Sequence, residues 1–176
     1  MHKNTISVYI IMEVYFKPII PDVMKIDRVR LNLLSMAHKV EREIKKEFKK
    51  TVETWEHDVE FQTKISLIGG PSVKVWTEDQ IYAWVNDGTP EHPIAAKNKP
   101  ELAYRRGFKS KTVPRKISSR VGKTFGRMVR KKAVTHPGIV PREFVDVIKE
   151  RYTPKFIMHA EEAIVKGIIE MGAAEK

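Results

Sequence analysis

The side chains best suited to chemistry in this 176-residue sequence are its six histidines, and their spacing keeps them apart. No two stand at the HxxxH or HExxH spacing that places two metal ligands on one helix face, so we expect no metal site. His92 and His136 each precede a proline at a predicted turn, where we expect them to position the loop rather than to catalyse a reaction. The remaining histidines are His2, His38, His57 and His159.

Covalent and acid/base catalysis find no support in the residue pattern either. The absence of cysteine excludes disulfides, thiolate nucleophiles and cysteine zinc sites. No GxSxG elbow is present, and spacing singles out no pair of carboxylates as an acid/base couple. The Gly69-Gly70 pair lacks both the Lys-Ser/Thr and the helix start of a phosphate-binding loop. We therefore expect no catalytic residue, no cofactor and no enzyme; an enzyme with an unfamiliar site ranks last among the alternatives.

The basic residues give the strongest pattern. Between Arg105 and Lys132 there are twelve Lys or Arg residues and no Asp or Glu, whereas the other 148 residues hold 21 basic and 22 acidic side chains. The net charge of +11 therefore lies in one segment of a nearly neutral chain. The twelve residues are Arg105, Arg106, Lys109, Lys111, Arg115, Lys116, Arg120, Lys123, Arg127, Arg130, Lys131 and Lys132.

This basic segment suits two kinds of partner. Its cations could contact DNA phosphates, with Phe108 and Phe125 as stacking groups. The same composition is that of a solvated, mobile arm, which we expect more strongly than DNA contact, and such an arm could equally meet an acidic surface on a neighbouring subunit. Helix breakers within the segment predict a flexible loop or a long hairpin arm rather than a basic helix. They are Gly107, Pro114, Gly122 and Gly126.

Hydrophobic periodicity predicts the elements that precede this segment. A strand is expected over 6–16, where β-branched and aromatic residues are frequent. Apolar residues recur at spacings of three and four over 23–48, which predicts a long amphipathic helix. The period changes to two over 59–67, and a turn at 69–72 leads to a returning strand at 73–76, which together predict a β-hairpin.

The second half of the chain returns from strands to helix. A strand is expected over 102–108, and residues 128–135 have enough β character to pair back onto the sheet. Helix is predicted after Pro141, with an interruption at Pro154 that gives two C-terminal helices.

Together these elements predict an α+β fold, in which an antiparallel β-sheet with hairpins packs against a long N-terminal helix and C-terminal helices. The length suits a single domain over 1–176, with an N-terminal strand or extension at 1–21 and a basic insertion at 105–132. The natural start could be Met1 or Met12, a choice that the pattern leaves open.

Composition excludes several classes of protein. The chain is 41% hydrophobic and 31% charged, like ordinary soluble proteins, and it has no apolar run near the roughly 20 residues that span a bilayer. The apolar segment 6–16 is broken by Glu13 and lacks a small-residue cleavage site, so we do not expect a signal peptide. The lack of cysteine agrees with a reducing cytoplasm. We expect no membrane partner.

Two turns and their flanks resemble a known family. An apolar run at 81–85 leads through Asn86-Asp87 to Gly88-Thr89, and His136-Pro137-Gly138 precedes Pro141 and Phe144. This order resembles the minor-tail and tail-completion family related to the head-tail joining proteins of long-tailed bacteriophages. That family places a tyrosine-rich apolar segment before Gly-Thr and a His-Pro-Gly turn before the last helix. The resemblance covers the layout of about residues 22–170.

The resemblance implies a structural part that assembles as a ring at the head-tail or tail-completion interface. It implies as partners other copies of the chain and neighbouring neck or tail proteins, with DNA in the channel as a further contact, and a location in the virion after assembly in the host cytoplasm. Two departures stand out: family members often have Glu and an aromatic residue where this chain has Asn86-Asp87, and the insertion at about 109–126 is longer and more basic. The alternative is a nucleic-acid-binding protein that uses segment 105–132.

Overall fold

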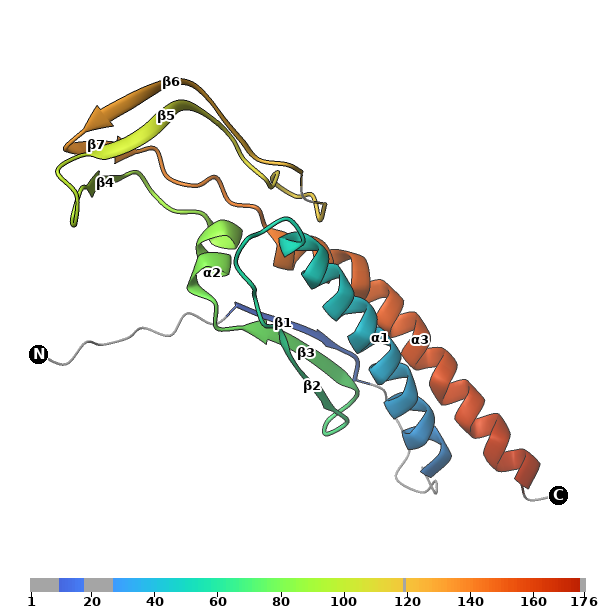
Figure 1. The fold of residues 1–176 in the computed structure, drawn as a ribbon. Coiled ribbons are helices and arrows are strands. Elements are labelled where there is room, and N and C mark those ends of the chain that lie inside the picture. Colours follow the sequence, from blue (N-terminus) through green and yellow to red (C-terminus); the bar gives the residue numbers. More distant parts are fainter. Residues whose placement is uncertain (1–9, 18–26, 119, 175–176) are drawn as a thin grey trace, which may run out of the picture.

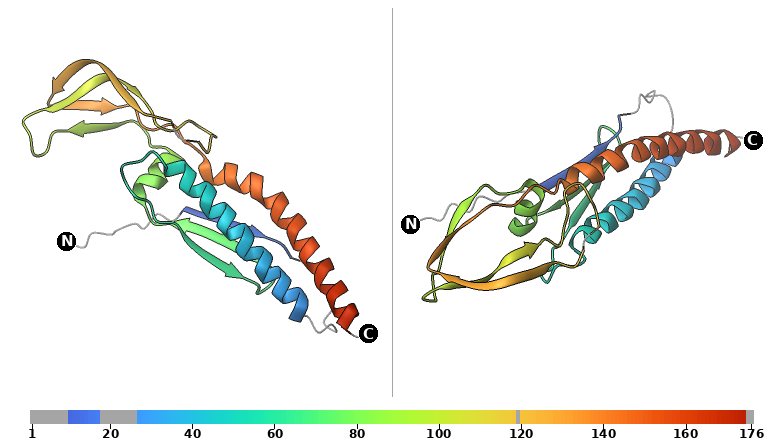
Figure 2. Two further views of the ribbon diagram at one scale, coloured as in Figure 1. Left: turned by 45° about the vertical axis from the view of Figure 1, so that its right-hand side comes forward. Right: turned by 90° about the horizontal axis from the view of Figure 1, so that it is seen from above.

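A computed structural model of the chain describes residues 10–17, 27–118 and 120–174. The fold is α+β, as predicted: a three-stranded antiparallel sheet lies beside two long helices, and a lobe of four strands extends from one end (Figure 1). The elongated shape is clear in both further views (Figure 2). His2, the possible start at Met1 and the predicted helix start at 23–26 lie outside the described residues.

The sheet has the strand order β1-β3-β2 and forms one wall of the core. Strand β1 covers Ile10–Tyr15, β2 covers Gln62–Ser66 and β3 covers Ser72–Thr77. Alternate residues of β1 and β3 are fully buried, as a sheet with one face on the core requires. These residues are Met12, Val14, Val73 and Val75. The predicted N-terminal strand and the predicted hairpin are confirmed, with the turn at Gly69 and Gly70 at positive φ.

Helix α1 covers Asp27–Val52 and confirms the predicted amphipathic pattern. One of its faces is buried against the sheet and the C-terminal helix, and its other face carries charged residues. The buried apolar residues are Val29, Leu33, Met36, Ala37, Val40, Ile44 and Phe48.

Helix α3 covers Phe144–Ala174 and passes through Pro154 without a break, so the prediction of two C-terminal helices is wrong. Proline removes one backbone hydrogen bond, but Pro154 lies on the exposed side of α3, where water can bind the carbonyl that is left without a partner. Ile148 before it and Phe156 after it are both fully buried in the same core. Their shared burial holds the two halves of α3 in one helix.

Helices α1 and α3 approach each other closely at Gly167. A Cβ at this position would lie 2.6 Å from Cα of Val29, so only glycine allows the observed separation. Further along the same contact, Glu47 is nearly buried and its carboxylate binds Arg151 of α3 at 2.7 Å. A paired carboxylate at a buried position fixes how the two helices align.

The remaining elements form the lobe and its attachment. The apolar run at 81–85 is part of a short helix, α2 (Gln80–Asp87), which Asp79 caps by accepting a hydrogen bond from the Tyr82 amide at 2.7 Å. The lobe has two separate two-stranded ladders, so the prediction that 128–135 returns to the main sheet is wrong. Strand β4 (His92–Ala95) pairs with β7 (Ala133–His136), and β5 (Leu102–Lys109) pairs with β6 (Lys123–Lys131).

The two glycines in the second half of α3 provide a matched test of this packing. Gly167→Ala should lower the free energy of unfolding by about 1–3 kcal/mol, because the added methyl group forces the helices apart. Gly172→Ala should raise it by up to about 1 kcal/mol, because alanine favours helix and the position is open. Urea denaturation measures both. An equal effect at the two positions would show that α1 and α3 do not pack at Gly167.

Candidate functional site

The two turns that carry the family resemblance lie in contact, although 50 residues separate them. Thr89 and Ile139 form a β-bridge in which each backbone N–H donates to the other residue's carbonyl oxygen at 3.0 Å. The Ile139 amide also lies 3.0 Å from the Thr89 hydroxyl oxygen. This pair joins the start of β4 to the end of β7 at the point where the lobe leaves the core, and we call it the junction.

Glycine is required on both sides of the junction. Gly88 and Gly138 have φ values of 80° and 83°, which residues with a Cβ rarely adopt. A Cβ at Gly88 would lie 2.6 Å from the Ile139 carbonyl oxygen, and one at Gly138 would overlap the Thr89 carbonyl. The Gly-Thr and His-Pro-Gly turns thus interlock through their backbones.

Asn86 links the junction to the start of α3. Its side-chain oxygen accepts a hydrogen bond from the Val145 amide at 3.1 Å, and its carbonyl accepts from the amides of Arg142 and Glu143 at 3.0 and 3.1 Å. Asn86 is nearly buried, so it caps the helix out of solvent. In the sequence this residue stands out only as a departure from the family pattern, because the helix that it caps begins 58 residues later in the chain.

The two histidines of the junction have structural partners. His92 and His136 lie opposite each other in the β4–β7 ladder, with ring centroids 5.0 Å apart. His92 Nδ1 lies 2.9 Å from the Pro90 carbonyl, and the Gly138 amide donates to His136 Nδ1 at 3.1 Å. The described residues include no group of three His, Asp or Glu side chains arranged to hold a metal ion.

The centre of the basic segment is folded onto the core. Lys111 Nζ donates to the Thr54 carbonyl at 2.9 Å, and Ile117 is 7% exposed. Arg115 binds Glu143 at 2.7 Å and Glu150 at 2.8 Å, and these hydrogen bonds raise the pKa of its guanidinium. The prediction of a flexible loop therefore fails for 110–118, which forms a second attachment of the lobe.

Arg142 connects this second attachment to the junction. It is 8% exposed, and its Nε donates to the Thr112 hydroxyl at 3.0 Å. Burial, followed by the positive charge of Arg120, lowers the pKa of Arg142, but arginine remains a cation at neutral pH.

The prediction of a hairpin is confirmed, with its closed end on the core and its open end at the far tip of the lobe (Figure 1).

The β5–β6 hairpin has two different faces. Arg105 pairs with Met128 and Gly107 pairs with Phe125, so β6 contains one extra residue, in a bulge at Gly126. Paired residues point to the same face of the hairpin, and neighbours along a strand point to opposite faces. The register therefore shows to which face each paired side chain belongs. The first face, which we call the basic face, consists of Ala103, Arg105, Lys109, Lys123, Phe125, Met128 and Arg130, with Gly107 beneath the Phe125 ring.

The basic face is exposed along its whole length. Lys109 and Lys123 are directly opposite each other, a like-charge pair that destabilises an isolated hairpin. Phe125 and Met128 are 51% and 52% exposed between the cations. Phe108 lies on the other face, so the two predicted stacking groups do not form one platform.

The structure divides the twelve predicted contact residues into three groups. Lys111, Arg115, Lys116 and Arg120 belong to the segment that lies on the core, and Lys132 forms the corner between β6 and β7. Among the described residues, ion pairs are found only for Lys111 and Arg115 of the twelve. The seven on the strands are Arg105, Arg106, Lys109, Lys123, Arg127, Arg130 and Lys131.

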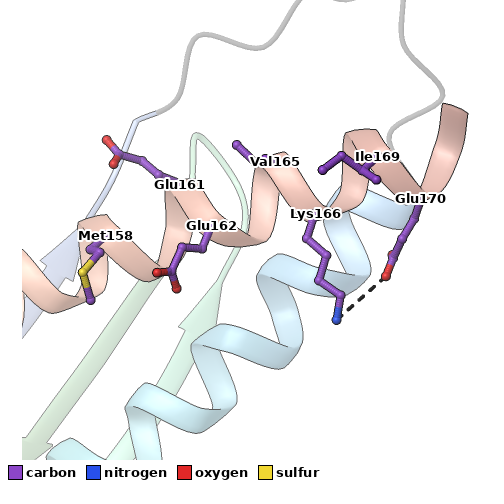
Figure 3. Close-up of a pocket in the computed structure, with 7 residues that line it drawn as sticks. All are labelled: Met158, Glu161, Glu162, Val165, Lys166, Ile169 and Glu170. Carbon is purple, nitrogen blue, oxygen red and sulfur yellow. Dashed lines mark ion pairs between the residues drawn. The ribbon is translucent and has the colours of Figure 1, made fainter.

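A second exposed surface, which the sequence patterns did not predict, lies on the outer side of α3. Figure 3 shows Glu161, Val165 and Ile169 pointing to one side of the helix and Glu162, Lys166 and Glu170 to the other. We call this surface the α3 stripe, a shallow groove in which apolar side chains alternate with three carboxylates and one amine. It is lined by Met158, Glu161, Glu162, Val165, Lys166, Ile169 and Glu170. The sequence does contain one indication of this surface, because the apolar residues of 156–171 fall on all sides of the predicted helix and cannot all face the core.

Comparisons with known protein families, curated proteins and solved structures find no match to this chain. None of the described helices combines the length and apolar character needed to cross a membrane.

The junction can be tested with two glycines that both have positive φ. Gly138→Ala should lower the free energy of unfolding by about 3 kcal/mol or more, because backbone strain adds to overlap with Thr89. Gly69→Ala has the strain alone, since nothing lies within 4 Å of its added Cβ, and should cost about 1 kcal/mol. Thermal and urea unfolding give the comparison. Equal losses would mean that the two turns do not interlock.

Proposed function

We propose that this protein is a structural component of a tailed bacteriophage, which assembles as a ring in the neck or tail. The observation that carries the proposal is the Thr89–Ile139 bridge. The two turns that resemble the tail-completion family are distant in sequence, yet they contact each other and jointly set the start of α3. Such a contact gives a physical reason for the two turns to occur together in one chain.

The distribution of exposed groups also supports an assembly role. The basic face lies at one end of an elongated molecule, and the α3 stripe lies toward the other end (Figures 1 and 2). Exposed apolar residues bordered by charge are typical of surfaces that bind other proteins. On this proposal the partners are other copies of the chain and neighbouring neck or tail proteins, and no step of covalent chemistry is needed.

A nucleic-acid-binding protein is the second candidate, because four cations share one exposed face of β5–β6. If DNA binding is the main activity, duplex affinity should fall steeply with salt, with a slope that reflects about four phosphate contacts. Replacing Arg105, Lys109, Lys123 and Arg130 by glutamine should remove that slope. Filter binding over a range of salt concentrations measures it, with the pair Arg106→Gln and Lys131→Gln on the opposite face as the control.

The structural proposal is tested by mass spectrometry of gradient-purified tailed particles from cells that carry this gene. We expect the chain at a low and constant copy number relative to the major tail protein, as a ring component requires. Particles made with the Gly138→Ala protein should contain less of it than particles with Gly69→Ala. Absence of the chain from intact particles would contradict the proposal and favour the nucleic-acid alternative.

A further inference from the structure

We infer that copies of this protein associate head to tail, with the basic face of β5–β6 in one copy seated on the α3 stripe of the next. This inference deepens the proposed function, since it names the two surfaces that would join subunits of the ring. It rests on what each surface exposes and on their places in the molecule.

The α3 stripe has the composition of a covered surface. Val165 and Ile169 are 56% and 66% exposed, and Met158 is 48% exposed. Helix α1 shows what a solvent-facing side looks like in this protein, because charged residues dominate its outer face. Over 158–169 the exposed side of α3 instead combines four large apolar residues with Glu161, Glu162 and Lys166, which favours contact with another protein. The four are Met158, Val165, Ile168 and Ile169.

The basic face offers the complementary chemistry. Its apolar residues, Phe125 and Met128, lie between cations, whereas the apolar residues of the stripe lie beside carboxylates, of which Glu170 pairs with Lys166 at 3.8 Å. Aromatic residues, methionine and arginine are the types enriched in protein interfaces, and Arg105 and Arg130 add two planar cations that can bind carboxylates in bidentate fashion. A nucleic-acid duplex, whose bases are stacked inside the helix, would contact the cations through its phosphates and leave Phe125 and Met128 exposed to water.

The two surfaces are similar in length. From Met158 to Ile169 the helix rises about 17 Å, at 1.5 Å per residue. From Lys123 to Arg130 the bulged strand covers about 21 Å, at about 3 Å per residue. An apolar centre with charge on its flanks can therefore be matched along the whole contact.

The arrangement of the surfaces also decides the symmetry. A two-fold contact of α3 with α3 whose axis passes near Glu161 and Glu162 would bring these carboxylates close to the same carboxylates of the partner, which is unfavourable. The basic face and the stripe are different surfaces in different parts of the molecule, so their contact is heterologous and leaves one of each free in a dimer (Figure 2). Repetition of a heterologous contact builds a closed ring or a filament.

Disulfide cross-linking tests the contact directly, because the natural chain has no cysteine. A chain with Met128→Cys and Val165→Cys should form a ladder of covalent oligomers under mild oxidation. The control, Met128→Cys with Leu31→Cys, keeps one cysteine in place and moves the other to an exposed position on α1. No ladder, or a ladder as strong in the control, would overturn the inference.

Charge reversal shows whether the named face is responsible. Arg105→Glu with Arg130→Glu should slow cross-linking at least about tenfold, and adding Glu161→Arg with Glu162→Arg to the same chain should restore it. Arg106→Glu with Lys131→Glu places equal charge on the opposite face and should have little effect. Equal effects of the two pairs of substitutions on the hairpin would contradict a specific contact between these surfaces. So would a failure of the Glu161→Arg and Glu162→Arg substitutions to restore cross-linking.

The outcome for this interface is distinguishable from the outcome for the proposed function. Suppose that the chain is found in particles at constant copy number but that the Met128→Cys and Val165→Cys variant does not cross-link. This result would overturn the head-to-tail contact alone. If the chain with Arg105→Glu and Arg130→Glu bound duplex DNA more weakly but cross-linked as before, the basic face would be assigned to DNA instead.

Discussion

The backbone bridge between Thr89 and Ile139 determines where the lobe leaves the core and where α3 begins. It closes a loop of about fifty residues, and that loop contains the whole lobe. Because Gly88 and Gly138 allow the two turns to interlock, Asn86 comes to lie where it caps α3, and the helix then packs along α1 as far as Gly167. The path from turn to cap to helix connects the lobe to the core through hydrogen bonds rather than through a large apolar contact.

The lobe is held at two places, which determines what its charged residues can do. The junction fixes β4 and β7, and the segment around Ile117 fixes the closed end of β5–β6 through Lys111 and Arg115. The hairpin is therefore attached to the core and is not a free arm, so its cations lie in a defined order on two faces. Such preorganisation lowers the entropy lost on binding and favours contact with one complementary surface.

Several parts of this structure could be predicted from sequence because their patterns are local. Helix α1 was correctly predicted from the spacing of its apolar residues, and strands β2 and β3 from their alternation. The helix breakers within the basic segment correctly predicted the hairpin. The predictions failed where distant contacts decide. Burial on both sides of Pro154 outweighs its missing hydrogen bond, and Asn86 could not be recognised as a cap while its helix was 58 residues away. The basic segment illustrates the same limit, since a count of twelve cations did not reveal which of them lie on the core.

Cryo-electron microscopy of purified tailed particles tests the proposed role of this protein in the assembly of a phage neck or tail. We expect a ring at the neck or tail in which density fits this fold, with the β5–β6 ribbon of each copy against α3 of the next. A map of intact particles in which every ring of the neck and tail is assigned to other chains would contradict this role.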